Sequence, residues 1–320
     1  MRRTAVQNDG VFNIDPVSIQ NLKELTSESC ALYEERICEI AYIADVIASA
    51  SAPFLDDGLS ISDAFALISE SKADLVGEAN RPEINSVFST ESFLRGLDDM
   101  DKATLAELIA EKLAGIGYEV CERDFLPTDD GAETFTYVKS VLADEAFDVF
   151  SQNFSDPRVA YAGTFKEACF AVADGKVGYC ILPLEEKGGA RIPGIYSLML
   201  GLDLKINEVT PVFGPEGTSD MKYALLGRGF SIPEREEDTD RYLEIRFDKS
   251  AELGELFSAA RKFGLSVYRI NTMYSGDSES PEEFYSVVFK DGGGGFSTLL
   301  TYLAIFFDGY TSVGIYKNLE

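Results

Sequence analysis

Residues 241–320 carry the pattern that most constrains the fold, because strand-length and helix-length segments follow one another there in a fixed order. Alternating apolar residues predict strands, and apolar residues three or four positions apart predict helices. The predicted elements, in chain order, are residues 242–248, 251–263, 266–275, 283–290, 296–307 and 312–317. This order is βαββαβ, in which two helices cover one face of a four-stranded antiparallel sheet.

This ferredoxin-like split arrangement leaves two strands at the edges of its sheet. An edge strand presents unpaired backbone groups, so we expect two copies to join edge to edge or face to face as a homodimer. The glycine run at residues 292–295 precedes the second helix but matches neither a GxGxxG nor a P-loop pattern. It predicts a loop rather than a phosphate cradle.

The segment before it, residues 134–229, alternates short strands with helix-length segments, which predicts an α/β wind with a mostly parallel sheet. The expected strands are 134–139, 158–162, 177–184 and 222–228, and the expected helices are 143–154, 164–174 and 192–202. The charged segment 232–240 predicts a solvated linker.

Residues 14–114 carry apolar residues at helical spacing, and a strand is predicted at 118–125. The Pro and Gly of residues 127–131 indicate a boundary. We therefore expect a helical N-terminal region at 1–130, an α/β domain at 131–232 and the βαββαβ domain at 240–320. The fold class is α/β plus α+β.

The charge balance restricts the partners. Lys and Arg number 28 against 55 Asp and Glu, which gives a formal net charge of −27. Such a chain repels a phosphate backbone and an anionic membrane surface, so we expect no nucleic acid and no membrane as partner. A small anionic ligand needs only local positive charge and stays possible.

Cysteine and histidine usage restricts the chemistry further. The five cysteines are scattered, odd in number and without a CxxC pair, which indicates reduced thiols and a cytoplasmic protein. The start shows no signal peptide, and no run of eighteen apolar residues predicts a membrane span. The chain has no histidine, so the commonest general base and metal ligand is missing. We expect neither a metal site nor a cofactor.

Residues 164–187 read Thr-Phe-Lys-Glu-Ala-Cys-Phe-Ala-Val-Ala-Asp-Gly-Lys-Val-Gly-Tyr-Cys-Ile-Leu-Pro-Leu-Glu-Glu-Lys. This segment resembles the prephenate dehydratase family, in which Ser/Thr-Phe opens a helix, a Gly ends it, and the next strand closes on a Pro-Ile-Glu-Asn-Ser turn. Residues 194–206 continue the resemblance, and the βαββαβ unit is similar to the ACT domain that follows dehydratase domains. The resemblance covers about residues 134–320 and leaves the first 130 unexplained.

The resemblance implies loss of water and carbon dioxide from prephenate to give phenylpyruvate, on the route to phenylalanine. In the family, a Thr-Arg-Phe triplet on the return strand supplies a hydroxyl to protonate the leaving group and a guanidinium to hold a carboxylate. The matching positions here are Met221, Lys222 and Tyr223. Lysine remains a point charge, but methionine cannot donate a proton, so the catalytic residues stay unknown.

The resemblance also implies a ligand site, at positions Thr164, Phe165, Glu185, Glu186, Lys187, Arg191 and Lys222. Glu186 and Lys187 replace the family's amide and hydroxyl, so this site is more highly charged. Only residues 208–220 stand where the family inserts a second lobe. The cleft therefore becomes a groove, and one hypothesis is that the N-terminal helices cover it.

The ACT-like unit departs from its family at the effector positions Leu253, Asn271 and Thr272. The family's glycine before the first helix is missing, so the backbone cannot approach an amino acid as closely, which disfavours feedback by phenylalanine. Residues 32–36 resemble the first helix of chorismate mutase domains, but a lysine expected three turns later is absent, and an amphipathic core helix explains the same pattern.

Three functions stay open. The first, which we favour, is a non-catalytic, dehydratase-like module that binds a small carboxylate or aromatic ligand, or regulates. The second is a working prephenate dehydratase, a lyase, with Tyr223 or Glu185 as acid and Lys222 as carboxylate anchor. The third is an oligomeric assembly protein that uses its sheet edges.

Overall fold

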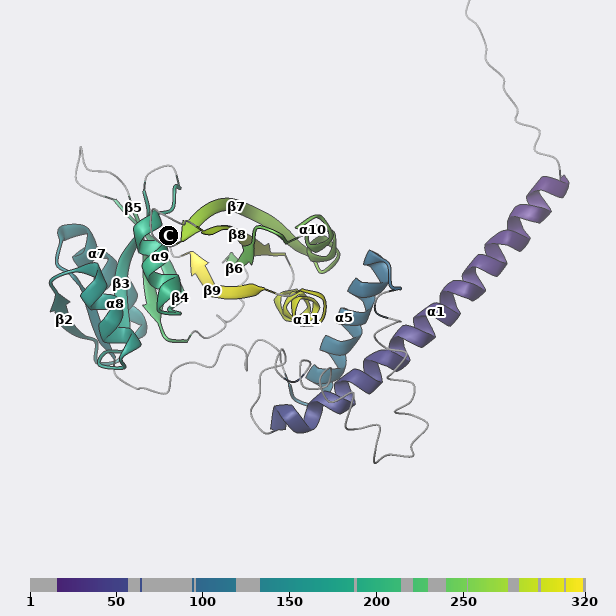
Figure 1. Cartoon of the computed structure of the whole chain (residues 1–320), viewed down its shortest axis with the longest axis horizontal. Coiled ribbons are helices and arrows are strands. Elements are labelled where there is room, and N and C mark those ends of the chain that lie inside the picture. Colours follow the sequence, from purple (N-terminus) through teal and green to yellow (C-terminus); the bar gives the residue numbers. More distant parts are fainter. Residues whose placement is uncertain are drawn as a thin grey trace, which may run out of the picture.

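The computed structural model describes residues 16–56, 64, 94, 96–118, 133–186, 189–213, 221–229, 240–251, 253–275, 282–292, 295–307 and 309–318. Their strands form a mixed sheet with helices packed on it, in agreement with the expected α/β character (Figure 1). The strand order is β2-β1-β3-β5-β4-β9-β6-β8-β7. The first five strands in this order and the last four belong to two different parts of the chain.

The first part, which we call the α/β unit, comprises residues 134–227. Its elements are β1 (Thr134–Val138), α7 (Val141–Phe150), the 3-10 turn η1 (Ser151–Asn153), β2 (Arg158–Ala162), α8 (Phe165–Ala173), β3 (Tyr179–Glu186), α9 (Pro193–Gly201), β4 (Lys205–Val212) and β5 (Met221–Gly227). β1 pairs in parallel with β2 and β3, whereas β5 runs antiparallel between β3 and β4. The predicted alternation of strands and helices is confirmed, with element ends shifted by a few residues and with the helix expected at 143–154 shortened to α7 plus η1. The expectation of a mostly parallel sheet is wrong, because β5 runs antiparallel to both β3 and β4, and β4 was not among the expected strands.

Two helices of the α/β unit begin where the sequence supplies a capping hydroxyl. The side chain of Ser140 accepts a hydrogen bond from the backbone N–H of Ala143, and that of Thr164 accepts one from Glu167. These caps satisfy N–H groups that have no partner inside the helix. α8 is followed by Gly175, whose φ of +70° suits glycine.

The second part, which we call the C-terminal unit, comprises residues 241–318. Its elements are β6 (Arg241–Asp248), α10 (Leu253–Lys262), β7 (Leu265–Ser275), β8 (Glu282–Asp291), α11 (Phe296–Phe306) and β9 (Tyr310–Asn318). The predicted βαββαβ order is confirmed. β6 pairs antiparallel with β8 and β9, and β7 pairs antiparallel with β8, which leaves β7 at the edge of the sheet.

The two units share one continuous sheet because β4 pairs in parallel with β9. Ile206 lies in register with Gly314 at this junction. A Cβ atom on Gly314 would lie 2.6 Å from the carbonyl oxygen of Ile206, so only glycine fits without a shift of the backbone. No pattern in the sequence predicted that the two expected sheets would form one.

The C-terminal unit's sheet has different neighbours on its two faces. Leu243, Ile245 and Phe247 of β6 pack in a core with α10 and α11. Tyr242, which precedes them, packs in a second core with residues of α9 and β3. The α/β unit therefore covers the face of the sheet that α10 and α11 leave open.

The N-terminal helix α5 (Asp99–Gly115) lies beside α10 and α11, and α1 (Pro16–Asp56) packs on α5 (Figure 1). Lys102 of α5 forms an ion pair with Glu255 of α10 at 3.0 Å, and buried residues of both N-terminal helices share the core of α10 and α11. The hypothesis that these helices cover the groove of the α/β unit is therefore wrong. The N-terminal half of α1 extends away from the other described elements.

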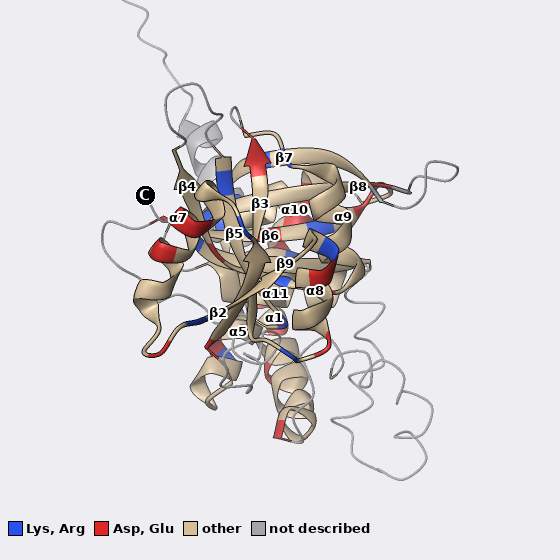
Figure 2. Cartoon of the chain, turned by 90° about the vertical axis from the view of Figure 1, so that its left-hand side faces the viewer, with Lys and Arg blue, Asp and Glu red and all other residues tan. Residues whose placement is uncertain are grey.

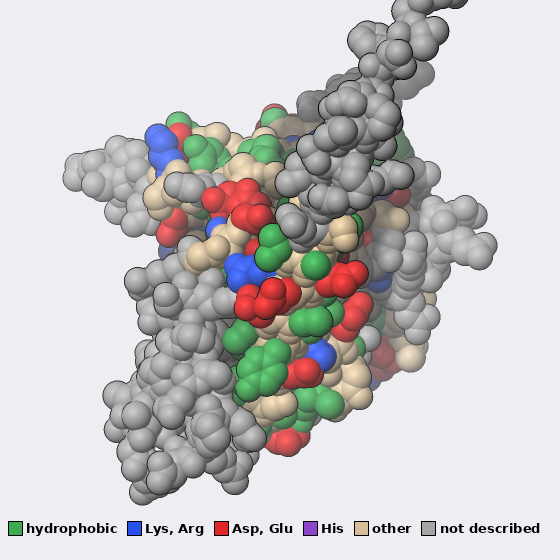
Figure 3. All heavy atoms as spheres, turned by 90° about the vertical axis from the view of Figure 1, so that its right-hand side faces the viewer, with side chains coloured by type: hydrophobic (Ala, Val, Ile, Leu, Met, Phe, Trp, Pro, Cys, Tyr) green, Lys and Arg blue, Asp and Glu red, His purple; other side chains and the backbone are tan. Residues whose placement is uncertain are grey.

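Within the described residues, the segment Ser29–Asp56 of α1 is long and apolar enough to cross a membrane by length and composition, and 33% of its apolar stretch is buried. A core helix of a soluble protein meets the same criterion, and the buried side chains of Ile40, Ala44 and Ile47 form part of such a core. At this end of the molecule, surface hydrophobic side chains are interspersed with acidic ones (Figure 3).

Several predicted features lie outside the described residues. They are Lys187, the greater part of the strand at 118–125, the boundary at 127–131 and nearly all of the linker at 232–240. In the part that the structure describes, acidic side chains occur on α7, α8 and the end of β3 (Figure 2). The same part contains no group of three or more Cys, Asp or Glu side chains placed to hold a metal ion.

Candidate functional site

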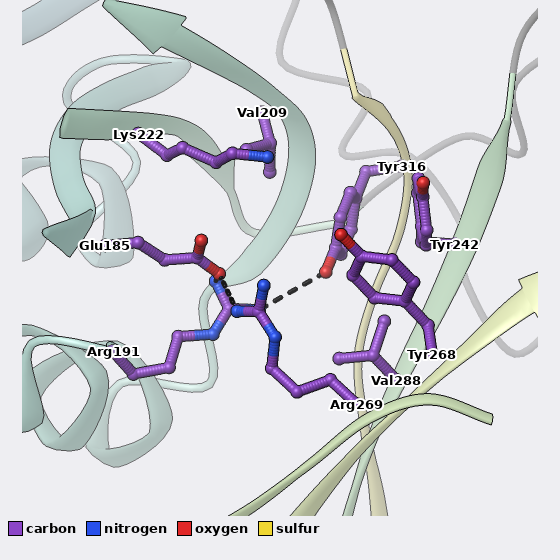
Figure 4. A pocket seen from close by; sticks show the side chains of 9 residues that line it. All are labelled: Glu185, Arg191, Val209, Lys222, Tyr242, Tyr268, Arg269, Val288 and Tyr316. Carbon is purple, nitrogen blue, oxygen red and sulfur yellow. Dashed lines mark hydrogen bonds and ion pairs between the residues drawn. The ribbon is translucent and has the colours of Figure 1, made fainter. Parts of the chain in front are cut away.

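A pocket lies where the α/β unit meets the C-terminal unit's sheet (Figure 4). Its lining comes from both units: Glu185, Arg191, Val209, Lys222, Tyr242, Tyr268, Arg269, Val288 and Tyr316. The empty volume is about 320 Å³, part of which is open to solvent.

Glu244, in the middle of β6, is fully buried next to this pocket. Its Oε1 accepts hydrogen bonds from the hydroxyls of Tyr196 at 2.7 Å and Ser286 at 2.6 Å. Its Oε2 accepts from the hydroxyl of Tyr316 at 3.0 Å and from Nη2 of Arg191. A buried carboxylate is tolerated only when it is paired and hydrogen-bonded, and these four donors meet that requirement.

Arg191 connects Glu244 to the pocket, and its side chain is 2% exposed. Its Nη1 lies 3.0 Å from Oε1 of Glu185. Burial lowers the pKa of Arg191, but interactions with Glu244, Tyr316 and Glu185 outweigh burial, so the pKa is raised above its usual value. Arg191 is therefore a permanent cation in the wall of the pocket.

Glu185 and Arg191 face each other across a short turn after β3. Gly189 in this turn has a φ of +82°, which glycine adopts at little cost. Arg269 of β7 holds the turn at two points, since its Nη1 donates both to the Glu185 carboxylate and, at 3.0 Å, to the carbonyl of Gly189. The C-terminal unit thus fixes the conformation of a turn that belongs to the α/β unit.

Three tyrosines form the wall of the pocket on the side of the C-terminal unit. The ring centroid of Tyr242 lies 4.9 Å from that of Tyr268 and 6.0 Å from that of Tyr316. Burial, and secondly the charge of Glu244, raises the pKa of Tyr316 well above its usual value, and the same causes act on Tyr196. Both buried phenols therefore stay protonated and donate hydrogen bonds to Glu244.

The pocket gathers positive charge in a chain whose formal charge is −27. Arg191, Arg269 and Lys222 line it, together with the carboxylate of Glu185. Lys222 is in register with Glu185 across β5 and β3, and its side chain runs above Glu185 and the two guanidinium groups in Figure 4. Such a cluster of cations can attract and orient a small anion.

Of the seven ligand-binding positions predicted from the sequence, the structure brings Glu185, Arg191 and Lys222 together in this pocket. Thr164 caps α8 and Phe165 begins it, and neither lines the pocket. Glu186 is exposed at the end of β3, and Lys187 lies outside the described residues.

The neighbours of Lys222 point the other way, because side chains alternate along a strand. Met221 and Tyr223 pack against a core formed by β1 and α7. Burial raises the pKa of Tyr223, whose side chain does not line the pocket.

The predicted effector positions lie on different elements. Leu253 begins α10 and packs on the helix side of the sheet. Asn271 is in register with Ser286, and side chains of directly opposite residues lie on the same face of a sheet. Ser286 binds Glu244 on the face opposite to α10 and α11, so Asn271 faces the α/β unit. Thr272 is exposed on β7.

Sequence reasoning missed the part of the site that comes from the C-terminal unit, above all Glu244 and Arg269. One signal was present, because Glu244 stands between the apolar residues Leu243 and Ile245 in β6, and a charge in a covered strand requires a partner. The identity of that partner was not readable, since Arg191 precedes Glu244 by 53 residues.

The fold and pocket define a protein with one mixed sheet and a pocket between its two units. No protein family matches the sequence, and no curated protein matches it. Solved structures that resemble part of the chain include the prephenate dehydratase of Streptococcus mutans, at 15% identity and a TM-score of 0.46 over 58% of this chain and 99% of that chain. The prephenate dehydratase of Arthrobacter aurescens in complex with L-Phe is similar at 11% identity and a TM-score of 0.40, over 57% of this chain and 89% of that one. A quorum quenching acylase, GqqA, is similar at 18% identity and a TM-score of 0.43, over 58% and 95%.

Proposed function

We propose that this chain is a prephenate-dehydratase-like protein without dehydratase chemistry, which binds a small carboxylate in the pocket between its two units. The observation that carries the proposal is the meeting of Glu185, Arg191 and Lys222 at one pocket. The sequence resemblance selected these residues from separate segments, and Arg269 adds a further cation beside them. A role in aromatic amino acid metabolism, on the phenylalanine branch, follows from the resemblance of residues 164–187.

The chemistry of the site supports binding rather than catalysis. Met221 stands where the family has its hydroxyl, and Tyr223 packs in a core on the opposite side of β5 from Lys222. The Glu185 carboxylate already contacts two guanidinium groups, those of Arg191 and Arg269. The residues suggested as acids are therefore poorly placed to protonate a leaving hydroxyl.

The C-terminal unit fits the role of an ACT-like regulatory domain, and we propose the division into domains 1–130, 131–232 and 240–320 on this basis. Its edge strand β7 carries the exposed side chains Val267, Ile270 and Tyr274. An exposed edge of this kind supports pairing with a second copy. Sedimentation at tens of micromolar tests this homodimer, and a strictly monomeric profile would count against it. The buried, unpaired Cys169 and Cys180 support a cytoplasmic location.

An active dehydratase is the second candidate, and one observation favours it. The Tyr268 phenol lines the same pocket as Lys222, so a proton donor and a carboxylate anchor face one cavity. In this case Lys222 would hold the substrate, and loss of Lys222 would abolish turnover.

The test uses the full-length protein with prephenate, and follows phenylpyruvate by its absorbance in alkali. We expect no turnover, together with a rise in thermal midpoint when a small aromatic acid or keto acid is added. Lys222→Ala should reduce that rise, whereas Lys176→Ala, at a side chain that is 71% exposed, should leave it unchanged. Turnover that disappears in Lys222→Ala would refute the binding proposal in favour of the enzyme.

A further inference from the structure

We infer that this pocket selects ligands with a single carboxylate and that Glu185 sets the selectivity. The inference rests on the proposed function, since it names the class of carboxylate that the same pocket takes. Glu185 is a wall of the pocket, and its side chain is 5% exposed. It meets Arg191 on its own turn and Arg269 on β7.

Both arginines already have carboxylate partners. Arg191 binds Glu185 and the fully buried Glu244, and Arg269 binds Glu185 and the carbonyl of Gly189. A ligand carboxylate that took the place of Glu185 on either arginine would leave the Glu185 charge buried without its partner, which is strongly unfavourable. The two guanidinium groups therefore do not form a seat for a second ligand carboxylate.

Lys222 approaches the pocket from the other side (Figure 4). An ammonium group is a compact charge without the fork of a guanidinium, and it suits one carboxylate. The remaining lining is largely apolar or aromatic, with Val209, Val288 and the three tyrosines. The fitting ligand has one carboxylate near Lys222 and an apolar or aromatic group on the tyrosines.

Glu185 also penalises a second negative charge directly. Because Glu185 itself lines the pocket, a bound dicarboxylate brings its second charge close to the Glu185 carboxylate. Like charges repel more strongly in such a partly enclosed site than in bulk water. Removal of the Glu185 charge should therefore reduce the difference in binding affinity between mono- and dicarboxylates.

A matched pair of probes tests this selectivity, because 3-phenylpropanoate and benzylmalonate share a benzyl group and differ by one carboxylate. Isothermal titration calorimetry with the full-length protein should show benzylmalonate binding at least about tenfold more weakly. The uncharged 3-phenylpropanamide should not bind. In Glu185→Gln, the difference between the two acids should fall below about threefold or reverse.

Asp203→Asn provides the matched control, since it removes the same charge at a side chain that is 75% exposed and does not line the pocket. The Asp203→Asn protein should prefer 3-phenylpropanoate over benzylmalonate by the same factor as the unchanged protein. If the unchanged protein binds neither acid, the proposed function falls. If it binds benzylmalonate as tightly as 3-phenylpropanoate, the selectivity is refuted while carboxylate binding stands.

If the Glu185→Gln protein keeps the affinity ratio of the unchanged protein for the two acids, only the role of Glu185 in selectivity is refuted. Should that variant fail to fold, as judged by far-UV circular dichroism, Glu185→Asp replaces it. The shorter side chain keeps the charge, so the preference for the monocarboxylate should persist. Loss of that preference in folded Glu185→Asp would overturn the assignment to charge.

Discussion

Arg191 and Glu244 form an ion pair in which the two side chains are 2% and 0% exposed, although 53 residues separate them in the sequence. The pair crosses from the turn after β3 to the middle of β6, and thus from the α/β unit to the C-terminal unit. Two buried charges are costly unless hydrogen bonds compensate them, and Glu244 receives four. The relative position of the two units is therefore tied to the completeness of this network.

Glu244→Gln should destabilise the protein severely, because it leaves Arg191 buried with one carboxylate fewer. Loss of one partner from a buried ion pair costs about 3–5 kcal/mol. Urea unfolding followed by far-UV circular dichroism measures this, since the chain has no tryptophan. Asp156→Asn, which disrupts an ion pair whose side chains are 74% and 72% exposed, should change little. A Glu244→Gln protein as stable as Asp156→Asn would contradict the importance of the network.

Stability should fall as the pH rises above the ordinary tyrosine pKa of 10.0, because burial raises the pKa of Tyr196 and Tyr316 in the folded state. The unfolded chain then releases protons that the folded chain retains, which favours unfolding. Urea midpoints between pH 9 and 11 measure the slope. Tyr316→Phe should flatten it, whereas Tyr33→Phe, at a ring that is 64% exposed, should not. Equal slopes in the two variants would argue against the buried phenols as its cause.

Arg269→Gln should loosen the turn between Glu185 and Arg191, because Arg269 holds that turn through a carboxylate and a backbone carbonyl. A hydrogen bond to a charged group contributes about 1.5–3 kcal/mol. Hydrogen–deuterium exchange of a peptide covering residues 184–192 should accelerate. Arg261→Gln, at an exposed position in the last turn of α10, provides the control. An unchanged exchange rate would show that the turn keeps its conformation without Arg269.

Gly314→Ala should destabilise the junction of the two units, since the added Cβ would lie 2.6 Å from the carbonyl oxygen of Ile206. Overpacking of this kind costs about 1–3 kcal/mol. Gly254→Ala in α10 adds the same methyl group where no atom lies within 4 Å, and should stabilise by up to about 1 kcal/mol. Thermal midpoints of the two variants should therefore move in opposite directions, and a shift in the same direction would refute the packing argument.

Local patterns carried most of the secondary structure. The caps at Ser140 and Thr164 and Gly175 after α8 are signals within a few residues, and α7 and α8 begin close to the expected positions. The pairing of β4 with β9 depends on the absence of a side chain at Gly314, more than a hundred residues after Ile206. No local periodicity reports such a contact, so two sheets were expected where one forms.

The same distinction between local patterns and contacts of distant residues applies to the site. Glu185, Arg191 and Lys222 were selected because they match a family pattern in the α/β segment, and all three line the pocket. The C-terminal unit's share of the lining was missed because the resemblance assigns that unit a separate regulatory role. The N-terminal region was expected to cover the groove, but the C-terminal sheet lies there. The buried Glu244 of that sheet requires hydrogen-bond donors, and Arg191 and Tyr196 of the α/β unit supply them.

The parallel pairing of β4 with β9 also limits how this protein can change during evolution. A gene rearrangement that removed the C-terminal unit would uncover β4 (Lys205–Val212) as a new edge with unpaired backbone groups, and such edges promote aggregation. A rearrangement that kept only the C-terminal unit would expose β9 in the same way. Gene rearrangements should therefore keep or lose the two units together. A rearrangement that replaces one unit must supply a new strand that pairs with β4 or β9 in the same register.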